Sequence, residues 1–380
     1  MTGEKLTAAR APVDWVAFSC AIALSLLGLV TMDSLSAQNP FFVRQIIWIV
    51  LGVGVFFAAR GADWRFLRRS GVAASLYALA CALLFSLFIV GHVVKGAQSW
   101  FNFGLFAFEP AELANLALIV VLAKYFSRRH IEIANIRHVL VSGFYALVLF
   151  VVVALQPDFG GSLIIFCVWL GMILVSGISR KHLFAVAALG IVAFSCLWQF
   201  GFHDYQRQRI MTFLHPLADV RGSGYNAFQS MIAVGSGELL GKGIGYGTQS
   251  KLRFLPEYQT DFMFAAFSEE WGFIGIILVF ALYGVLFWRL LVAAGKGATN
   301  FETLFTLGVL FYLAAHFMLH VGINMGLLPV TGTTVPFMSY GGSHILVEYL
   351  ALGMVAGMGA YARAAHRDQL NREFSGGYDR

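Results

Sequence analysis

Long apolar runs recur along this chain, and each is close to the length that crosses a lipid bilayer. Residues 13–32, 76–90, 140–155 and 274–288 contain almost no charged side chain, and roughly 20 apolar residues span the hydrocarbon core of a membrane. Over the whole sequence 59% of residues are hydrophobic and 12% are charged, whereas about 25% are charged in a soluble domain. These values exclude a water-soluble globule and predict an all-α, polytopic membrane protein.

Charged and turn-forming stretches divide the apolar runs into ten predicted helices. They cover residues 13–32, 45–59, 71–91, 110–126, 138–155, 159–176, 183–200, 262–288, 303–323 and 343–362. The first run ends at Asp33 without a cleavage pattern of small residues, so it is expected to remain as the first span. An even number of spans places both termini on one side. Residues 1–380 are predicted to form a single membrane domain.

Lysine and arginine are distributed unevenly between the connections, which predicts the orientation. With the N-terminus inside, only Arg44 and Lys95 fall in short outer connections, and six of the 26 basic residues fall in one long outer segment. All others lie in cytoplasmic connections or tails. Both termini are therefore predicted to be cytoplasmic. The net charge of +6 is mostly a by-product of this asymmetry and does not indicate nucleic-acid binding.

Cysteine and histidine spacing gives little sign of a metal site or a disulfide. The four cysteines are scattered inside apolar runs and are expected to be small core residues: Cys20, Cys81, Cys167 and Cys196. His316 and His320 lie four residues apart and have the spacing to share a metal, but no third ligand accompanies them, so a structural role is favoured. Glu348 is expected to be paired inside the bundle.

The segment 201–260 is the main exception to the short connections. It is polar and glycine-rich, yet it contains apolar residues such as Phe213, Leu214 and Phe228. A long loop without repeats is usually functional or disordered, and these anchors argue against disorder. We expect a large extracytoplasmic loop with short helices at the outer interface, one of them near 223–235. Two shorter outer segments run from 91 to 110 and from 324 to 342.

Acidic residues stand at the outer ends of three predicted helices, where an ionisable group is costly and is a functional candidate. Glu109 and Glu112 open the fourth helix, Asp158 the sixth and Asp261 the eighth. For Asp158, which follows a proline at the helix start, a capping role is favoured. Glu112 lies one turn inside its helix, so a functional role is favoured there.

Asp261 ends the stretch 254–262, in which a proline and several polar residues lead into an apolar helix. A carboxylate at this place is exposed enough to take a proton from a hydroxyl, and the adjacent apolar wall can raise its pKa. Asp261 is therefore a candidate general base. Glu269 and Glu270 lie two turns deeper, so at least one must face the protein interior, where a structural role is expected.

Basic residues alternate with glycines in the long outer segment. The stretch 235–247 contains six glycines, and such a run can offer backbone N–H groups and cations to a phosphate. The signal is weak because glycine-rich stretches also form plain turns, and the features of a P-loop are missing. The basic residues concerned are Arg207, Arg209, Arg221, Lys242, Lys251 and Arg253.

Several motifs together resemble one known family over nearly the whole chain. They are Lys-Gly-Ala-Gln-Ser-Trp at 95–100, Pro-Ala-Glu at 110–112, Gln-Pro-Asp-Phe-Gly at 156–160, Gly-Ile-Gly-Tyr-Gly-Thr-Gln-Ser at 243–250, the stretch 254–262, Gly-Leu-Leu-Pro-Val-Thr-Gly at 326–332 and Ser-Tyr-Gly-Gly-Ser at 339–343. In this order they resemble the SEDS family, and its elongation type more than its division type.

The resemblance implies a ten-helix glycosyltransferase that polymerises lipid II, and so extends undecaprenyl-linked glycan, at the outer face of the bacterial cytoplasmic membrane during cell elongation. It implies a class B penicillin-binding protein and other elongation-complex membrane proteins as partners. Asp261 and Glu112 take the catalytic positions. The substrate-binding candidates are Lys95, Trp100, Arg209, Lys242, Arg253, Gln249 and Ser343. A divalent cation, Mg or Mn, is an alternative to the basic groups for stabilising the pyrophosphate.

The chain departs from the family pattern at positions that bear on charge. Ser99 stands where arginine is common, and Asn115 where lysine is common, three residues after Glu112. Gln259, Gly161 and Glu109 replace a frequent His, Thr and Gln, respectively. Because the expected lysine is absent, we hypothesise that Lys95 provides the cationic partner of Glu112.

Two other functions compete with polymerisation. A lipid II flippase needs polar groups near the bilayer midplane and an alternating-access repeat, whereas the informative acids gather at the outer end and no repeat is visible. A structural scaffold for a penicillin-binding protein does not explain Asp261 beside so many basic residues. Polymerisation is therefore favoured.

Overall fold

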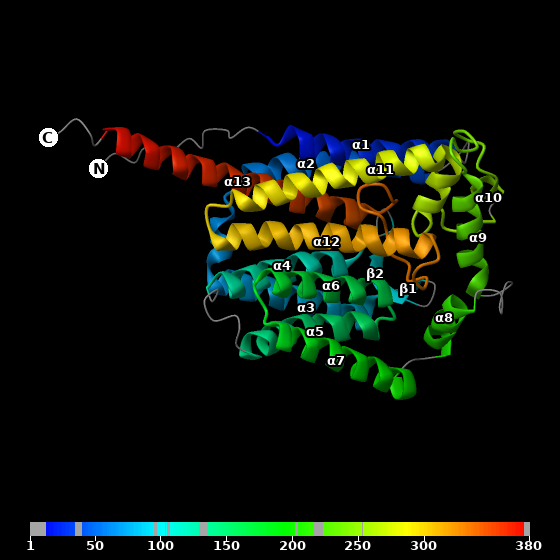
Figure 1. Ribbon diagram of the computed structural model, residues 1–380, viewed down its shortest axis with the longest axis horizontal. Helices are drawn as coiled ribbons and strands as arrows, with labels where there is room; N and C mark the ends of the chain where they lie inside the picture. The colour runs from blue at the N-terminus through cyan, green and yellow to red at the C-terminus, as the bar shows by residue number, and fades with distance from the viewer. Residues whose placement is uncertain are drawn as a thin grey trace.

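The computed structural model describes residues 13–34, 40–94, 97–102, 104, 107–128, 136–201, 204–215, 223–252 and 254–375. Within these ranges, ten long helices run side by side (Figure 1). They are α1 (Trp15–Ser34), α2 (Pro40–Gly61), α3 (Ser70–Val90), α4 (Pro110–Ser127), α5 (Ile136–Leu155), α6 (Phe159–Val175), α7 (Arg180–Cys196), α11 (Met263–Gly295), α12 (Asn300–Asn324) and α13 (Gly342–Ser375). Each corresponds to one predicted helix, so the all-α prediction is confirmed.

Length and hydropathy agree with a membrane bundle. Eight of the described helices are long and apolar enough to cross a bilayer. Of the other two, α6 is apolar but has 17 residues, and α13 carries His344 and Glu348 within its apolar part. The observed bounds differ most from the predicted ones at α11 and α13, which continue to Gly295 and Ser375.

The centre of the bundle is formed by α4 and α12. Most residues of each of these two helices are buried, and α4 contacts α3, α6, α12 and α13. At the other extreme α7 buries no residue. Cys196 at its end is exposed, so the prediction that all four cysteines are core residues is wrong for Cys196, because α7 lies at the edge of the bundle (Figure 1).

A small antiparallel sheet was not predicted. It has the strand order β1-β2-β3 and consists of β1 (His92–Val94), β2 (Ala97–Asn102) and β3 (Ala107–Phe108). His92 pairs with Trp100, and Phe101 pairs with Phe108. The sheet lies between α3 and α4, so it orders the loop that carries Trp100 to the start of α4.

The long segment after α7 contains the short helices that the sequence predicts. A π-helical turn, η2 (Leu197–Gly201), is followed by α8 (Asp204–Leu214), α9 (Ser223–Ser236) and α10 (Thr248–Lys251). The helix expected near 223–235 is confirmed as α9. Figure 1 shows α8 and α9 standing across one end of the bundle, where the sheet also lies.

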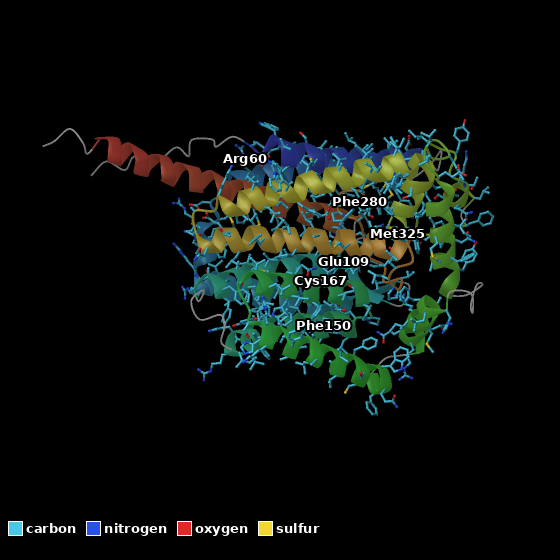
Figure 2. The ribbon with its side chains drawn as sticks, viewed as in Figure 1. Arg60, Glu109, Phe150, Cys167, Phe280 and Met325 are labelled. Carbon is cyan, nitrogen blue, oxygen red and sulfur yellow. The ribbon has the colours of Figure 1, made fainter. Side chains whose placement is uncertain are left out.

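The other end of the bundle contains the start of α1, and α13 projects beyond it (Figure 1). Arg60 and Met325 mark these two opposite ends in Figure 2. Near the end that carries Arg60, Arg289 pairs with Asp14 at 2.8 Å and Arg68 pairs with Glu302. The first and last described helices therefore reach the same end, opposite to the end that carries α8 and α9.

Helix α11 is broken at Gly272, whose φ of 63° lies in the left-handed region. The glycine-rich segment after α9 fills the break. Lys242 N donates to the Glu269 carbonyl at 2.9 Å, and Phe273 N donates to the Glu238 carbonyl at 2.9 Å. The two backbones touch, since a Cβ on Gly241 would lie 2.1 Å from the Glu270 carbonyl oxygen. The glycines are therefore required by this close approach.

Candidate active site

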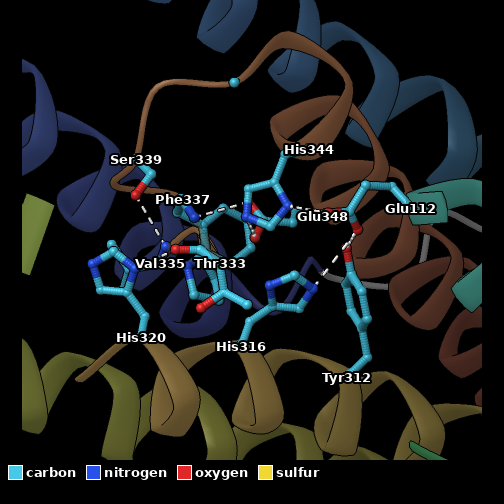
Figure 3. A network of polar contacts seen from close by, with 12 residues as sticks. Glu112, Tyr312, His316, His320, Thr333, Val335, Phe337, Ser339, His344 and Glu348 are labelled. Carbon is cyan, nitrogen blue, oxygen red and sulfur yellow. Dashed lines mark hydrogen bonds and ion pairs between the residues drawn. The ribbon is translucent and has the colours of Figure 1, made fainter. Parts of the chain in front are cut away.

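Buried polar side chains gather inside the bundle, between α4, α12 and α13. We call Glu112, Tyr312, His316, His344 and Glu348 the Glu112 cluster. Figure 3 shows their side chains converging from the three helices. Each member is at most 5% exposed. Buried ionisable groups in a membrane bundle are costly and mark functional sites by default.

Glu112 has three partners within this cluster. Its Oε1 lies 2.9 Å from His344 Nδ1, and its Oε2 accepts a hydrogen bond from the Tyr312 hydroxyl. His316 Nε2 lies 3.7 Å from the same Oε2. The hypothesised partner Lys95 lies outside the described residues. The structure therefore accounts for the Glu112 carboxylate without it.

His344 links Glu112 to Glu348. Its Nε2 lies 2.8 Å from Glu348 Oε1, and Glu348 Oε2 accepts a hydrogen bond of 2.8 Å from Phe337 N. The expectation that Glu348 is paired inside the bundle is confirmed. Through these contacts the loop after α12 is joined to α13 and α4.

Glu109 connects two of the predicted substrate-binding residues. Trp100 Nε1 donates to Glu109 Oε2 at 3.0 Å, and Glu109 N donates to Ser343 Oγ at 3.3 Å. Burial raises the pKa of Glu109 to about 8, with further contributions from the Glu112 and Asp158 carboxylates. Trp100 and Ser343 thus lie beside a carboxyl group that favours its protonated form, immediately before Glu112.

Asp158 caps α6, as predicted. Its Oδ1 accepts a hydrogen bond of 2.8 Å from Gly161 N. A Cβ on Gly161 would lie 2.3 Å from Asp158 Oδ2, so a larger residue at 161 would require the carboxylate to shift. Burial raises the pKa of Asp158 to about 6, while the Gly161 N–H opposes this shift.

Asp261 lies at the start of α11, where α12 holds the backbone. Asn324 Nδ2 donates to the Asp261 carbonyl at 3.1 Å, and Asn324 Oδ1 accepts from Ala265 N at 3.1 Å. His320 Nε2 accepts from Phe264 N at 3.3 Å. The residue at the N-cap, Phe262, has no side chain that can cap the helix, so α12 satisfies two of the free N–H groups of this helix end, those of Phe264 and Ala265.

The loop that follows α12 fixes the residues before Asp261 from the other side. Tyr340 N donates to the Gln259 carbonyl at 2.8 Å, and Ser339 Oγ donates to the Thr260 carbonyl at 2.9 Å. The half-buried Asp261 carboxylate approaches Gly332, because a Cβ on that glycine would lie 3.5 Å from Asp261 Oδ2. The candidate base is thus held in place by two segments that follow it by more than 60 residues.

His320 does not share a ligand with His316. Its Nδ1 lies 2.7 Å from the Thr333 carbonyl oxygen, and its Nε2 accepts from Phe264 N. Both ring nitrogens of His320 are used by backbone groups. The structural role favoured for this histidine is confirmed, whereas His316 faces Glu112 instead.

The basic candidates have different surroundings. Arg209, on α8, lines a small pocket of about 20 Å³ with residues at the start of α6 and after α12, and its charge acts on Asp158. Lys242 Nζ lies 2.7 Å from Glu269 Oε1, and Gln249 N donates to the same oxygen at 3.1 Å. Lys95, Arg221 and Arg253 lie outside the described residues. Their roles in substrate binding remain predictions.

Glu269 and Glu270 are both buried, so the expectation that at least one faces the interior is confirmed. Glu270 accepts from Ser34 Oγ at 2.7 Å and from Gly245 N at 2.8 Å. The backbone N–H groups and the lysine that the glycine-rich stretch offers are therefore used, in part, by carboxylates of α11.

Sequence reasoning missed that His316, His344 and Tyr312 surround Glu112. Tyr312 and His344 follow Glu112 by 200 and 232 residues. The one feature of the sequence that could have revealed these partners is that ionisable residues lie inside apolar helices. Glu112, His316 and His344 each offer one ligand atom, and these atoms lie within 4.8 Å of one another. The cluster therefore has the composition of a metal site.

Comparison with known proteins places this geometry in a family. Residues 11–364 match the family model described as "Cell cycle protein", which covers FtsW, RodA and SpoVE. The peptidoglycan glycosyltransferase MrdB of Escherichia coli is 38% identical over 305 residues, which are 80% of each chain. Stage V sporulation protein E of Bacillus subtilis is 32% identical over 94% of this chain and 100% of its own.

Solved structures show the same fold. A chain from a peptidoglycan synthase complex that coordinates polymerisation and crosslinking matches with a TM-score of 0.79 and 29% identity, over 92% of this chain and 98% of that one. The rod shape determining protein RodA of Thermus thermophilus matches with a TM-score of 0.69 and 28% identity, over 92% and 97%. On this agreement of sequence and fold, the chain belongs to the FtsW/RodA/SpoVE family, the SEDS proteins.

Proposed function

We infer that this chain is a peptidoglycan glycosyltransferase that polymerises lipid II at the outer face of the bacterial cytoplasmic membrane. The main support is its likeness to a glycosyltransferase of this name over 80% of each chain. Asp261 stands at the start of α11, at the end of the bundle that carries α8, α9 and the sheet. This is the end that the distribution of basic residues predicts to face outward.

The reaction joins two lipid-linked sugars. The 4-hydroxyl of an N-acetylglucosamine attacks the anomeric carbon of an N-acetylmuramic acid, and undecaprenyl pyrophosphate leaves. Asp261 accepts the hydroxyl proton as the C–O bond forms, which is the role of a general base. Its support is the fixed backbone, which Asn324 and Ser339 hold on either side. Glu112 is the second catalytic candidate.

The departing pyrophosphate needs positive charge nearby. Arg209 is the described candidate, because it lines the pocket between α8, the start of α6 and the loop after α12. The pocket wall is otherwise mostly apolar, with Phe159, Ile210 and Val330 among its residues. Such a wall suits the first isoprene units of a lipid carrier, and Arg209 beside it provides the charge that a pyrophosphate needs.

The biological setting follows from the relatives. One of them, MrdB, is 38% identical, and a structural neighbour belongs to a complex that couples polymerisation to crosslinking. By this likeness the chain acts in cell elongation and works with a class B penicillin-binding protein. The distribution of basic residues predicts that both termini are cytoplasmic.

Transport of lipid II is a second candidate, favoured by the buried Glu112 cluster. Transporters place polar groups inside the bundle, near the bilayer midplane. The two functions are separated by one experiment on purified protein in liposomes that contain lipid II, assayed with and without a class B penicillin-binding protein. A polymerase forms glycan strands, visible on a gel, whereas a flippase moves intact lipid II to the other leaflet.

The Asp261→Asn variant is the matched control, because the amide keeps the shape but cannot take the proton. General bases contribute about 10²- to 10⁴-fold, so polymer formation should fall by at least about 100-fold. Full polymerisation by this variant would reject Asp261 as the base. Lipid II movement without any polymer, in parent and variant alike, would favour the transporter.

Orientation is tested separately in a variant whose four cysteines are replaced. A cysteine introduced at Tyr246, which is 70% exposed, should react in intact cells with an impermeant maleimide. A cysteine at the exposed Lys296, at the other end of α11, should react only after the cells are lysed. The reverse pattern would place Asp261 on the cytoplasmic side and contradict synthesis at the outer face.

A further inference from the structure

The Glu112 cluster brings one carboxylate and two imidazoles together from three helices. Glu112 lies on α4, His316 on α12 and His344 on α13, and their ligand atoms lie within 4.8 Å of one another. Two histidines and one glutamate are an established ligand set for Zn²⁺. No step of the glycosyl transfer proposed above uses His316 or His344, so this arrangement needs another explanation.

His316 is the least satisfied member of the cluster. Its side chain is 2% exposed, and although the backbone of Thr334 offers its ring one hydrogen bond, no carboxylate among the described residues reaches its nitrogens at hydrogen-bond distance. A buried polar group without such a bond is costly. Its Nε2 lies 3.7 Å from Glu112 Oε2, too far for a hydrogen bond. Two ligands of one tetrahedral Zn²⁺ are about 3.4 Å apart.

The surroundings of the three residues match the outer layer of a metal site. A metal-bound histidine usually donates its other ring nitrogen to a carboxylate or a backbone carbonyl. His344 Nε2 lies 2.8 Å from Glu348 Oε1, which leaves Nδ1 facing Glu112. Glu348 is itself held by Phe337 N at 2.8 Å, and Tyr312 donates to Glu112.

The charge count also favours a divalent cation. Glu112 and Glu348 provide two carboxylates in a space where neither is more than 5% exposed. Within the described residues, the structure pairs both carboxylates with histidine rather than with lysine or arginine. A divalent cation bound between neutral imidazoles neutralises both carboxylates, and uncompensated buried charge is strongly unfavourable.

We propose that Glu112, His316 and His344 bind one Zn²⁺ ion that ties α4, α12 and α13 together inside the bundle. Imidazole ligands favour zinc over magnesium, which prefers oxygen donors. The fourth position falls to water or to the Tyr312 hydroxyl. The site uses Glu112, the second catalytic candidate named above, but zinc binding itself does not depend on the proposed function and is measured without an activity assay.

The alternative is a hydrogen-bond network without metal. It accounts for His344, which bridges Glu112 and Glu348 at 2.9 and 2.8 Å. It accounts less well for His316, whose Nε2 lies 3.7 Å from Glu112 Oε2 and so makes no hydrogen bond to that carboxylate. The two explanations therefore differ most in what they require of His316, and the test is built on that residue.

Full-length protein in detergent is stripped with a chelator, incubated with Zn²⁺ or Co²⁺ and dialysed, and its metal content is measured by mass spectrometry. The parent should retain one equivalent of Zn²⁺, should melt at a higher temperature with zinc than without it, and should give visible d–d absorption with Co²⁺. His316→Gln should retain at least about tenfold less zinc. His316→Cys should retain it, because thiolate is also a zinc ligand.

His182→Gln, on α7, is the matched control and should bind zinc as the parent does. Glu348→Gln should weaken binding by about 10- to 100-fold, the usual effect of losing an outer-layer partner. Far-UV circular dichroism and gel filtration check that each variant is folded, and the binding of zinc by His316→Cys guards against loss through misfolding. Trace zinc in the parent, equal zinc in His316→Gln and parent, or displacement by equimolar Mg²⁺ would each overturn the proposal.

Discussion

Lys242 and Glu269 form an ion pair of 2.7 Å that joins the glycine-rich segment to α11 beside the break at Gly272. The carboxylate is fully buried and the lysine side chain is 29% exposed. Glu269 Oε1 also lies 3.0 Å from Thr248 Oγ1. The pair thus connects the glycine-rich segment, which contains part of the family motif at 243–250, with α11, the helix that follows Asp261.

This pairing predicts the effect of removing the lysine. Lys242→Met leaves a buried carboxylate without its cation, a change that costs about 3–5 kcal/mol in a fully buried pair and less here, because the lysine is partly exposed. We expect the free energy of unfolding to fall by about 2 kcal/mol and the polymerisation activity to fall as well. The double variant Lys242→Met/Glu269→Gln should recover part of the stability, measured by thermal unfolding, and part of the activity, measured by polymerisation. Recovered stability without recovered activity would favour contact between Lys242 and substrate.

The close approach of two backbones makes a second prediction. Gly241→Ala places a Cβ 2.1 Å from the Glu270 carbonyl oxygen, so the break in α11 must open, at a cost of several kcal/mol. Gly243 has a φ of 94°, but a Cβ there meets only the Tyr246 ring, at 3.4 Å. Gly243→Ala should therefore cost only about 1–2 kcal/mol of backbone strain. Equal melting temperatures for the two variants would contradict the packing described.

Asn324 is expected to position Asp261 without touching substrate. Asn324→Ala removes the bonds to the Asp261 carbonyl and to Ala265 N, so the start of α11 loses two of its constraints. We expect kcat to fall by about 10- to 100-fold with KM nearly unchanged, since misplacing a catalytic group by about 1 Å has effects of this size. Asn324→Asp, which keeps the acceptor for Ala265 N, should retain more activity. A change confined to KM would argue instead for substrate contact.

The raised pKa of Glu109 predicts a pH-dependent stability. Its value of about 8 in the folded protein lies above its ordinary value of 4.5, so the folded state holds a proton that the unfolded state has lost. The contribution of Glu109 to stability is therefore greatest below pH 4.5 and declines as the pH rises toward 8, by at most about 1.4 kcal/mol per pH unit. Asp158, whose pKa is raised to about 6, adds to the decline at lower pH, so the part due to Glu109 is isolated by a variant.

The variant Glu109→Gln provides the comparison. Because its amide does not titrate, the melting temperature should change less between pH 6 and 8 than that of the parent. Above pH 9 the carboxyl group of residue 109 is ionised in both the folded and the unfolded parent. The difference in melting temperature between parent and variant should then become constant. Parallel curves over the whole range would show that Glu109 ionises normally in the fold.

The helices could be predicted because hydrophobicity and charge alone decide which stretches cross a membrane. The sheet could not, because strands of two to six residues such as β3 (Ala107–Phe108) and β2 (Ala97–Asn102) are too short to give a period. The left-handed break at Gly272 was also hidden inside an apolar run. It depends on the glycine-rich segment, whose docking is a tertiary event.

The parts of the site that could be predicted are those in which the position of one residue in the sequence indicates its role. Asp158 as a cap follows from its position after a proline, and the structure confirms it. The partners of Glu112 could not be derived, since Tyr312 and His344 follow it by 200 and 232 residues. Only the packing of α12 and α13 against α4 brings them to its carboxylate.

Because α11 is broken, the position of the reaction site does not depend on the thickness of the membrane. The helix has 33 residues, which at 1.5 Å each make about 50 Å, against a hydrocarbon core of about 30 Å. The part after Gly272 is about 34 Å long and can adapt to a thinner or thicker bilayer by tilting. The part before it, which follows Asp261, remains fixed by Asn324 and His320. Polymerisation rates should therefore vary little between liposomes whose lipids differ in acyl-chain length.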